Sequence, residues 1–433
     1  MAALETRSEP SHESALATLF ATVRANLPGA SWLQPLRAEA MARIQRDGLP
    51  HRRVEAWKYT DFRNKLSPNL LLATGEAAVA APDIFHTLNA HRISFAGGRL
   101  VQAPEPSTLS DGLEVISLGE ALAMPSIWLR QWLQPGDNPI ENLNLAFAAD
   151  GALVRVGKGV QVTTPIILRA SVGQAAMAHT RNVISLEENA ELTLIEIDDG
   201  ASSEQSLATA VTAINLEPGA RLRHLRVTAS EAASLVVRAD TIEIARDAEY
   251  RGIILSSGAA LARQQSTARL TGTGAAYSLA CAYAAGQDQH TDFALEVVHE
   301  APHTTSRILA KGVASGNGHG VVQGRAVVKA AAQKTDSHQL SRALLLSPHA
   351  EIDQKPELEI FADDVKCGHG AAVGALDPNQ LFYLRARGIP ESEARKLLIG
   401  AFLGEVTERL PEPYLAPVEA WLAGRMASLG AVA

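Results

Sequence analysis

The chain has 433 residues, which is more than one ordinary compact core holds and predicts two or three structural units. Hydrophobic residues make up 46% and charged residues 20%, a balance that excludes wholesale disorder. The net charge of −8 argues against nucleic acid or an anionic membrane as the main partner, because both attract dense positive charge.

Targeting signals and cysteines indicate the compartment. No segment reaches the roughly 18 consecutive apolar residues of a membrane-spanning helix, and residues 1–10 lack the basic start and apolar run of a secretory signal. The two cysteines, Cys281 and Cys367, form no CxxC pair, which fits a reducing compartment and excludes a disulfide framework. We therefore expect a cytoplasmic protein.

Residues 1–82 are predicted to form an N-terminal helical region followed by a connector. A first helix is indicated by apolar residues at helical spacing, and Pro28 and Gly29 end it; these are Leu16, Leu19, Phe20, Val23 and Leu27. A second helix is expected from Ser31 to a stop at Gly48. Residues 54–62 are aromatic-rich without a clear period, and the Ala-rich stretch 66–82 is typical of a connector.

Residues 83–376 have a different character and are predicted to form the β core. Short β-branched runs alternate with turn residues, and no helical stretch separates them, so a doubly wound α/β sheet is not expected. A phrase made of an apolar residue, a polar turn, a small residue and a second apolar position recurs. The small residues of its copies are Ala190, Ala220, Ala248 and Ala350, with a looser relative at Val160.

This repeat favours a solenoid. The small residues at 160, 190, 220 and 248 are 30, 30 and 28 positions apart, and we interpret each phrase as a corner at which the small residue permits close stacking. One such unit cannot bury its own apolar face, so neighbouring units must stack, as in a β-helix. A β-sandwich remains the alternative, since such corners also occur in other all-β proteins.

Residues 377–433 are predicted to form a C-terminal helical domain. Asp377 and Pro378 begin a first helix that stops at Gly388. A second helix opens at Pro390 and presents an apolar face made of Ala394, Leu397, Leu398, Ala401, Phe402 and Val406. A third helix is expected from about Pro417, and we expect these helices to offer a docking place for a partner.

The chain contains no P-loop, no dinucleotide-binding fingerprint and no hydrolase or zinc-protease motif. Its densest polar constellation runs from Lys334 to Gly374. Within it, Cys367 and His369 are two residues apart and lie on the same face of an extended strand. A thiol and an imidazole suit iron or zinc, and Lys366 is expected to favour the thiolate. The alternative is a small buried cysteine and a hydrogen-bonded histidine.

The number of thiols limits what the chain does alone. An iron–sulfur cluster usually takes four thiolates, whereas this chain has two at unrelated positions. Any cluster would therefore be shared with another chain or would use histidine and carboxylate ligands.

Two segments resemble the SufB/SufD scaffold family of SUF iron–sulfur cluster assembly. Residues 55–60 read EAWKYT, similar to the family's N-terminal signature. Residues 333–339 (QKTDSHQ), 350–360 (AEIDQKPELEI), 364–374 (DVKCGHGAAVG) and 381–390 (LFYLRARGIP) form a nearly unbroken match. The chain is shorter than SufB-type sequences and lacks their extra N-terminal cysteines, which favours the SufD branch. Gly368 and Ala372 stand where polar residues are frequent in the family.

The resemblance implies a mainly β fold with a right-handed parallel β-helix body between two helical regions. It implies a scaffold subunit without enzymatic activity, working with a SufB-type paralogue and a SufC-type ABC ATPase, or as a homodimer. His369 matches a histidine that faces an essential cysteine of SufB, and Cys367 matches its neighbour; the two are the candidate metal or cluster ligands. No tightly bound cofactor is expected in the isolated chain, only transient iron or cluster in the complex. The ATPase would dock near Arg385, Gly388, Ile389, Pro390 and Glu393.

The sequence also allows two other functions. The chain is a purely structural partner if His369 is incidental. A polysaccharide-active β-helix enzyme would need paired carboxylates and a base along a groove, for which Asp363, Asp364 and Lys366 are the best candidates. The absence of a secretion signal argues against the enzyme.

Overall fold

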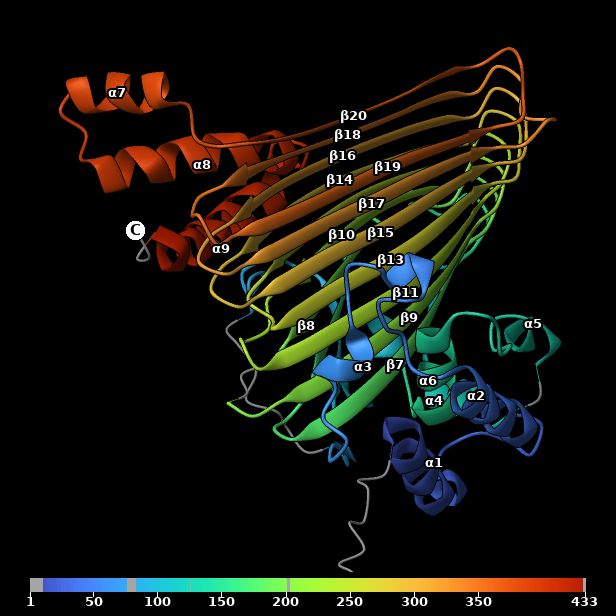
Figure 1. Ribbon diagram of the computed structural model, residues 1–433. Helices are drawn as coiled ribbons and strands as arrows, with labels where there is room; N and C mark the ends of the chain where they lie inside the picture. Colours follow the sequence, from blue (N-terminus) through green and yellow to red (C-terminus); the bar gives the residue numbers. More distant parts are fainter. Residues whose placement is uncertain (1–10, 76–82, 125, 201–202, 431–433) are drawn as a thin grey trace, which may run out of the picture.

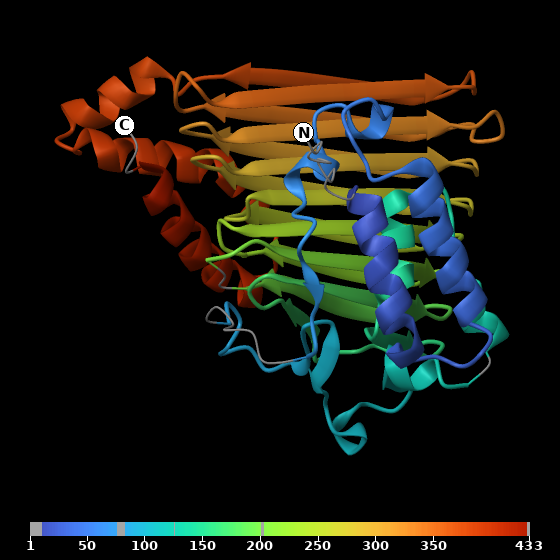
Figure 2. The same cartoon turned by 60° about the horizontal axis from the view of Figure 1, so that its bottom comes forward.

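The computed structural model describes residues 11–75, 83–124, 126–200 and 203–430 of the chain. Its body is a parallel β-solenoid of about eight coils, as the repeat predicted, with helices packed on both flanks (Figures 1 and 2). Residues 1–10 of the predicted N-terminal region and residues 76–82 of the predicted connector lie outside the described residues.

The solenoid consists of two ten-stranded sheets, here called sheet A and sheet B, and from Ala152 onward successive strands of the chain alternate between them. Sheet A contains β4 (Leu113–Ser117), β5 (Ala152–Val156), β7 (Ala176–Leu186), β9 (Ser206–Leu216), β11 (Ser234–Ile244), β13 (Leu261–Leu270), β15 (His290–His299), β17 (His319–Val328) and β19 (Glu351–Ile360), with β1 (Leu71–Leu72) beside β7. Sheet B contains β3 (Arg99–Gln102), β2 (His91–Ala96), β6 (Ile166–Ser171), β8 (Glu191–Asp199), β10 (Arg221–Thr228), β12 (Glu249–Ser257), β14 (Ala276–Ala285), β16 (Thr305–Ala314), β18 (Asp336–Leu345) and β20 (Lys366–Gly374).

The corner between each sheet A strand and the next sheet B strand explains the sequence repeat. One corner residue in each coil has a positive φ, and its backbone N–H donates to a carbonyl of the next coil at 2.7–3.4 Å. These residues are Gly159, Asn189, Gly219, Asp247, Gly274, His303 and Lys334. A small side chain follows in most coils and is fully buried, as at Ala190, Ala220, Ala248 and Ala275. Glycine and Asn or Asp adopt this left-handed backbone most easily, which accounts for the composition of the repeat.

The predicted copy at Ala350 belongs to a different corner. Ala350 lies between β18 and β19, where the chain returns from sheet B to sheet A at the opposite end of the strands. The residues after Ala350 return to a strand, as they do after the other corners, and this likeness explains why Ala350 matches the repeat in sequence. The repeat therefore marks the A-to-B corners only.

Between the two sheets the solenoid interior is largely apolar, but it also encloses a charged cluster. Glu196 is fully buried and accepts hydrogen bonds from Arg226 Nε, Arg238 Nη1 and His224 Nε2, each at 2.9 Å. Burial alone would raise the pKa of Glu196, but the charges and hydrogen bonds of Arg238, His224 and Arg226 hold it well below its usual value. Glu196 thus stays charged at neutral pH.

The helices before β5 are α1 (His12–Val23), η1 (Arg24–Asn26), α2 (Gln34–Asp47), η2 (Glu55–Trp57), α3 (Phe62–Lys65), η3 (Pro106–Thr108), α4 (Leu118–Ala121), α5 (Ile127–Arg130) and α6 (Pro139–Phe147). Most of them pack with the apolar side chains on the outer face of sheet A. The first two predicted helices are confirmed, with α2 ending at Gly48 as expected and beginning three residues late. The segment 118–147 was expected to lack helices, and α4 to α6 correct that expectation. Buried Arg37 of α2 joins it to the end of α6 by donating to the carbonyls of Leu145 and Ala148.

The aromatic-rich segment 54–62 is a clamp on sheet A. The Trp57 side chain is 1% exposed, and the Arg263 guanidinium of β13 lies 3.8 Å from the centre of its ring. Arg263 also pairs with buried Asp292 of β15, which accepts a hydrogen bond from Thr60. At the edge of the segment, Lys355 of β19 binds the Glu55 carboxylate at 2.5 Å. Residues 55–60 thus hold the N-terminal region to three different coils.

The C-terminal helices are α7 (Pro378–Ala386), α8 (Glu391–Thr407) and α9 (Glu412–Gly430), of which α9 begins earlier than predicted. Helices α8 and α9 cover the outer face of sheet B. The buried face of α8 contains Ala394, Ile399, Leu403 and Val406. The predicted members Leu397 and Ala401 are exposed instead, Leu397 to 51%. Among the described residues, no helix has the length and hydrophobicity needed to cross a lipid bilayer.

Trp57→Ala is expected to destabilise the protein by about 3–5 kcal/mol, because it leaves a cavity under the clamp and removes the aromatic partner of a buried guanidinium. The midpoint of urea unfolding checks this. Lys58→Ala, which removes an exposed neighbouring side chain, is the matched control and should leave the midpoint unchanged. Equal midpoints for the two variants would contradict the clamp.

Candidate functional site

The candidate site lies on the last coil of the solenoid. Cys367 and His369 both belong to β20, where Cys367 pairs in register with Ser337 and His369 with Gln339 of β18. The Cys367 side chain packs against the buried apolar group formed by Val328, Ala332 and Ala362, together with Val365. Because alternate residues of a strand share a face, His369 lies on the same side of β20 as Cys367, and its side chain is exposed.

This coil is the open end of the stack. Within the described residues, β19 pairs with β17 alone and β20 with β18 alone, so each has one edge without a neighbouring strand. In Figure 2 the two strands, coloured orange, lie at the top of the stack, with no further strand above them. Exposed apolar side chains flank the open end, namely Ile360, Phe361 and Val373.

The Cys367 thiol differs from its expected state. Burial raises the pKa of Cys367, and the nearby Asp336 charge raises it further. Lys366 was expected to favour the thiolate, but it lies beside Asp336, whose pKa it helps to lower. In the isolated chain the thiol is therefore protonated at neutral pH. Cys281 lies in the solenoid interior, where burial raises the pKa of its thiol strongly.

The carboxylates of the constellation have other partners. Asp336 binds Arg307 at 2.7 Å and His338 at 3.0 Å on the outer face of sheet B. Asp363 and Asp364 are exposed in the corner between β19 and β20, and Asp364 pairs with Lys334. The trio considered for a polysaccharide enzyme is thus an exposed corner whose second carboxylate already has a cationic partner.

The residues expected to dock an ATPase lie at the turn between α7 and α8. Arg385 Nη1 lies 3.2 Å from Glu391 Oε2, and Gly388 has a φ of 84°, which forms the turn. Pro390 is the N-cap of α8, and Ile389 and Glu393 flank it. Next to this turn, α7 buries none of its residues, and Phe382 and Tyr383 are 71% and 58% exposed. Figures 1 and 2 show α7 projecting beyond the solenoid.

Several polar residues at key positions were missed from sequence. Glu196 follows Leu192 and Leu194 in the inward alternation, so a carboxylate at an inward position was the available signal. Arg263 and Asp292 are register partners on the neighbouring strands β13 and β15. Nothing in their local sequence indicates that residues 55–60 cover them. These contacts depend on the tertiary fold.

Together the features define a class: a parallel β-solenoid flanked by helices, with a thiol and an imidazole at its open end. Residues 168–402 match the SufBD core domain of SUF iron–sulfur cluster assembly, and residues 10–168 match the SufBD N-terminal region. The chain belongs to the SufB/SufD family of iron–sulfur cluster assembly proteins.

Individual relatives agree with the family match. The iron–sulfur cluster assembly protein SufD of Escherichia coli is 30% identical over 383 residues, which cover 87% of this chain and 89% of the relative. A SufBD family iron–sulfur cluster assembly protein of Synechocystis is 32% identical, with 84% of each chain covered. SufB of Bacillus subtilis is 28% identical over 65% of this chain and 61% of its own length. These matches include both branches of the family.

The raised pKa of Cys367 predicts slow alkylation. Its reaction with iodoacetamide should have a pH midpoint above the value of about 8.5 of an unstructured cysteine, because only the thiolate reacts. Mass spectrometry across a pH series measures this midpoint. Asp336→Asn should lower it by removing a negative charge, whereas Lys366→Ala should not move it. A midpoint raised by Lys366→Ala would restore the original thiolate interpretation.

Proposed function

We propose that this protein is a SufD-type subunit without catalytic activity of its own, which works in a cytoplasmic complex with a SufB-type paralogue and a SufC-type ATPase. The proposal rests mainly on the last coil at the open end of the solenoid. It presents two unpaired strand edges, exposed apolar side chains and a thiol–imidazole pair at one place.

The end coil favours pairing with another solenoid. Unpaired strand edges carry free backbone donors and acceptors, and proteins usually cover such edges or use them for association. A SufB-type paralogue with an equivalent end coil would continue the sheets and cover Phe361, which is 61% exposed. A second copy of this chain would fit the same edges, giving a homodimer.

The cluster would form at this seam as cargo shared between chains. Cys367 and His369 supply at most two ligands from this chain, so a partner must complete the set. Coordination by iron would also overcome the raised pKa of Cys367, because metals displace the thiol proton.

The helical domain would connect the seam with the ATPase. Helix α8 packs on β14 and β16, where Lys311 of β16 pairs with Glu405 and lies 4.3 Å from the centre of the Phe402 ring. β16 is adjacent to β18, and β18 to β20. A movement imposed on α7 and α8 by ATP binding would thus reach the end coil through two strand pairings.

Cluster formation tests the site. The chain is copurified with its untagged partners and reconstituted anaerobically with iron and sulfide. His369→Ala should retain the partners but hold at least about tenfold less cluster, as expected for loss of a ligand. His338→Ala removes an imidazole from the outer face of the neighbouring strand and is the matched control. If the cluster content of His369→Ala equals that of the control, the chain is a structural arm.

Two phenylalanine variants separate the proposed docking surfaces. Phe382→Glu on α7 should abolish binding of the ATPase while leaving the paralogue bound, because it places a charge in the centre of an apolar contact. Phe361→Glu at the end coil should have the opposite selectivity. Pull-down with each purified partner measures both, and circular dichroism confirms folding. Loss of both partners in either variant would contradict two separate surfaces.

A further inference from the structure

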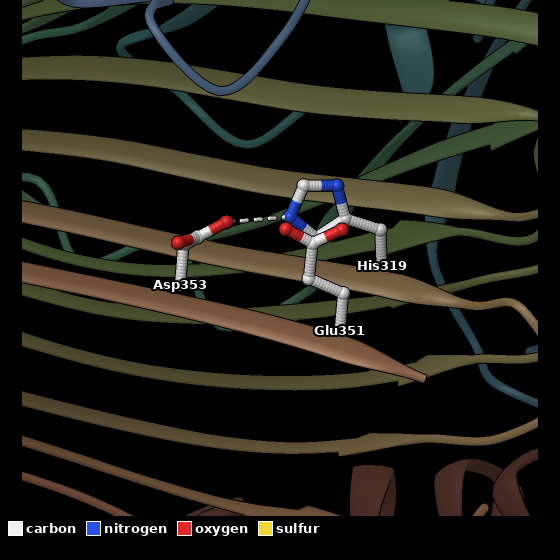
Figure 3. A group of neighbouring side chains, drawn as sticks. All are labelled: His319, Glu351 and Asp353. Atoms are coloured by element: carbon white, nitrogen blue, oxygen red, sulfur yellow. Dashed lines mark hydrogen bonds and ion pairs between the residues drawn. The ribbon is translucent and has the colours of Figure 1, made fainter. Parts of the chain in front are cut away.

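A second group of possible ligands lies on the outer face of sheet A. His319 of β17 and Glu351 and Asp353 of β19 each direct one ligand atom to a common place, and these atoms all lie within 4.8 Å of one another (Figure 3). His319 Nε2 lies 2.8 Å from Asp353 Oδ2. This cluster is on the opposite sheet from Cys367 and His369.

The stacking of the last two coils creates the cluster. His319 and Glu351 are direct partners in the parallel register of β17 and β19, so their side chains stand next to each other. Asp353 follows Glu351 by two positions and shares its face. The ring of His290, the partner of His319 on β15, packs edge-on at 4.5 Å, and His290 Nε2 is hydrogen-bonded to Thr60 at 2.8 Å. The His319 ring is thus supported from its other side.

The Glu351 carboxylate at the cluster has unused bonding capacity. Among the described residues, no hydrogen bond or ion pair engages it. Its side chain is exposed, whereas those of His319 and Asp353 are half-buried.

We propose that His319, Glu351 and Asp353 bind one divalent first-row transition metal, with Zn²⁺, Mn²⁺ and Fe²⁺ as the candidates. One imidazole and two carboxylates suit these borderline ions rather than soft Cu⁺. A neutral imidazole and two carboxylates carry a charge of −2, which a divalent cation balances. Ligand atoms at about 2.0–2.2 Å from the metal stand roughly 3–3.5 Å apart. The side chains therefore need only small rotations to close on an ion.

Such an ion would bridge β17 and β19 and fasten the final strand of sheet A. Metal that binds the folded chain alone raises its stability by mass action. Binding therefore has a readout that is independent of cluster assembly: the temperature of unfolding should rise with metal concentration.

The test uses the full chain, freed of metal by chelation, in a Cys367→Ser, His369→Ala background that removes the other ligand pair. Calorimetric titration with Zn²⁺, Mn²⁺ and, anaerobically, Fe²⁺ should show one equivalent bound to the parent. His319→Ala and Glu351→Gln should each weaken binding at least tenfold. Glu359→Gln is the matched control, because Glu359 lies on the same face of β19 but pairs with Arg325.

The outcomes separate clearly. The site is supported if the parent and the Glu359→Gln variant bind metal more tightly than the two ligand variants do. The unfolding temperature should then rise with metal only for the proteins that bind it tightly. No binding by the parent overturns it, as does binding that all variants retain equally. Circular dichroism of the metal-free variants excludes misfolding as the cause of lost binding.

Discussion

The in-register stacking of one corner on the next is the constraint on which the structure depends. At each turn from sheet A to sheet B, a residue with positive φ directs its N–H to a carbonyl of the following coil. This bond fixes both the rise between coils and the position of each strand along its neighbour. A slip of one residue would exchange the inward and outward faces of a strand. The interior ion cluster around Glu196 and the inward Cys367 both require that register.

The same stacking leaves a solenoid with exposed lateral faces and exposed ends, and the chain covers them unequally. Apolar side chains on the outer face of sheet A are buried by the N-terminal helices, and those of sheet B by α8 and α9. At the beginning of the stack, β4 and β3 pair antiparallel with their neighbours. The last coil has no equivalent cover within the described residues. The proposed association with another solenoid would therefore be directed to one end of the molecule, where β19 and β20 are exposed.

Sequence patterns predicted the features that depend on local and repeated residues. They failed for features that depend on tertiary packing. The spacing of Ala190, Ala220 and Ala248 indicated the coils because each copy forms the same turn. The shared face of Cys367 and His369 followed from strand geometry alone. The pKa of Cys367 could not be predicted, since it depends on burial and on Asp336 of the neighbouring strand. The partnership of His319 with Glu351 likewise depends on corner lengths. Helix α8 is turned so that Ile399 and Leu403 pack on sheet B, which leaves Leu397 exposed.

The two flanks differ in how they can transmit force to the last coil. On sheet A the clamp joins Glu55 to Lys355 of β19, and Trp57 and Thr60 to β13 and β15, so the N-terminal region holds these coils together. On sheet B the helical domain contacts β14 and β16, but the coil of β20 lies beyond both. A load applied at α8 would therefore act on one sheet while the clamp restrains the other. The expected response is a shear of β20 against β19, which is the movement that would alter the surroundings of Cys367 and His369.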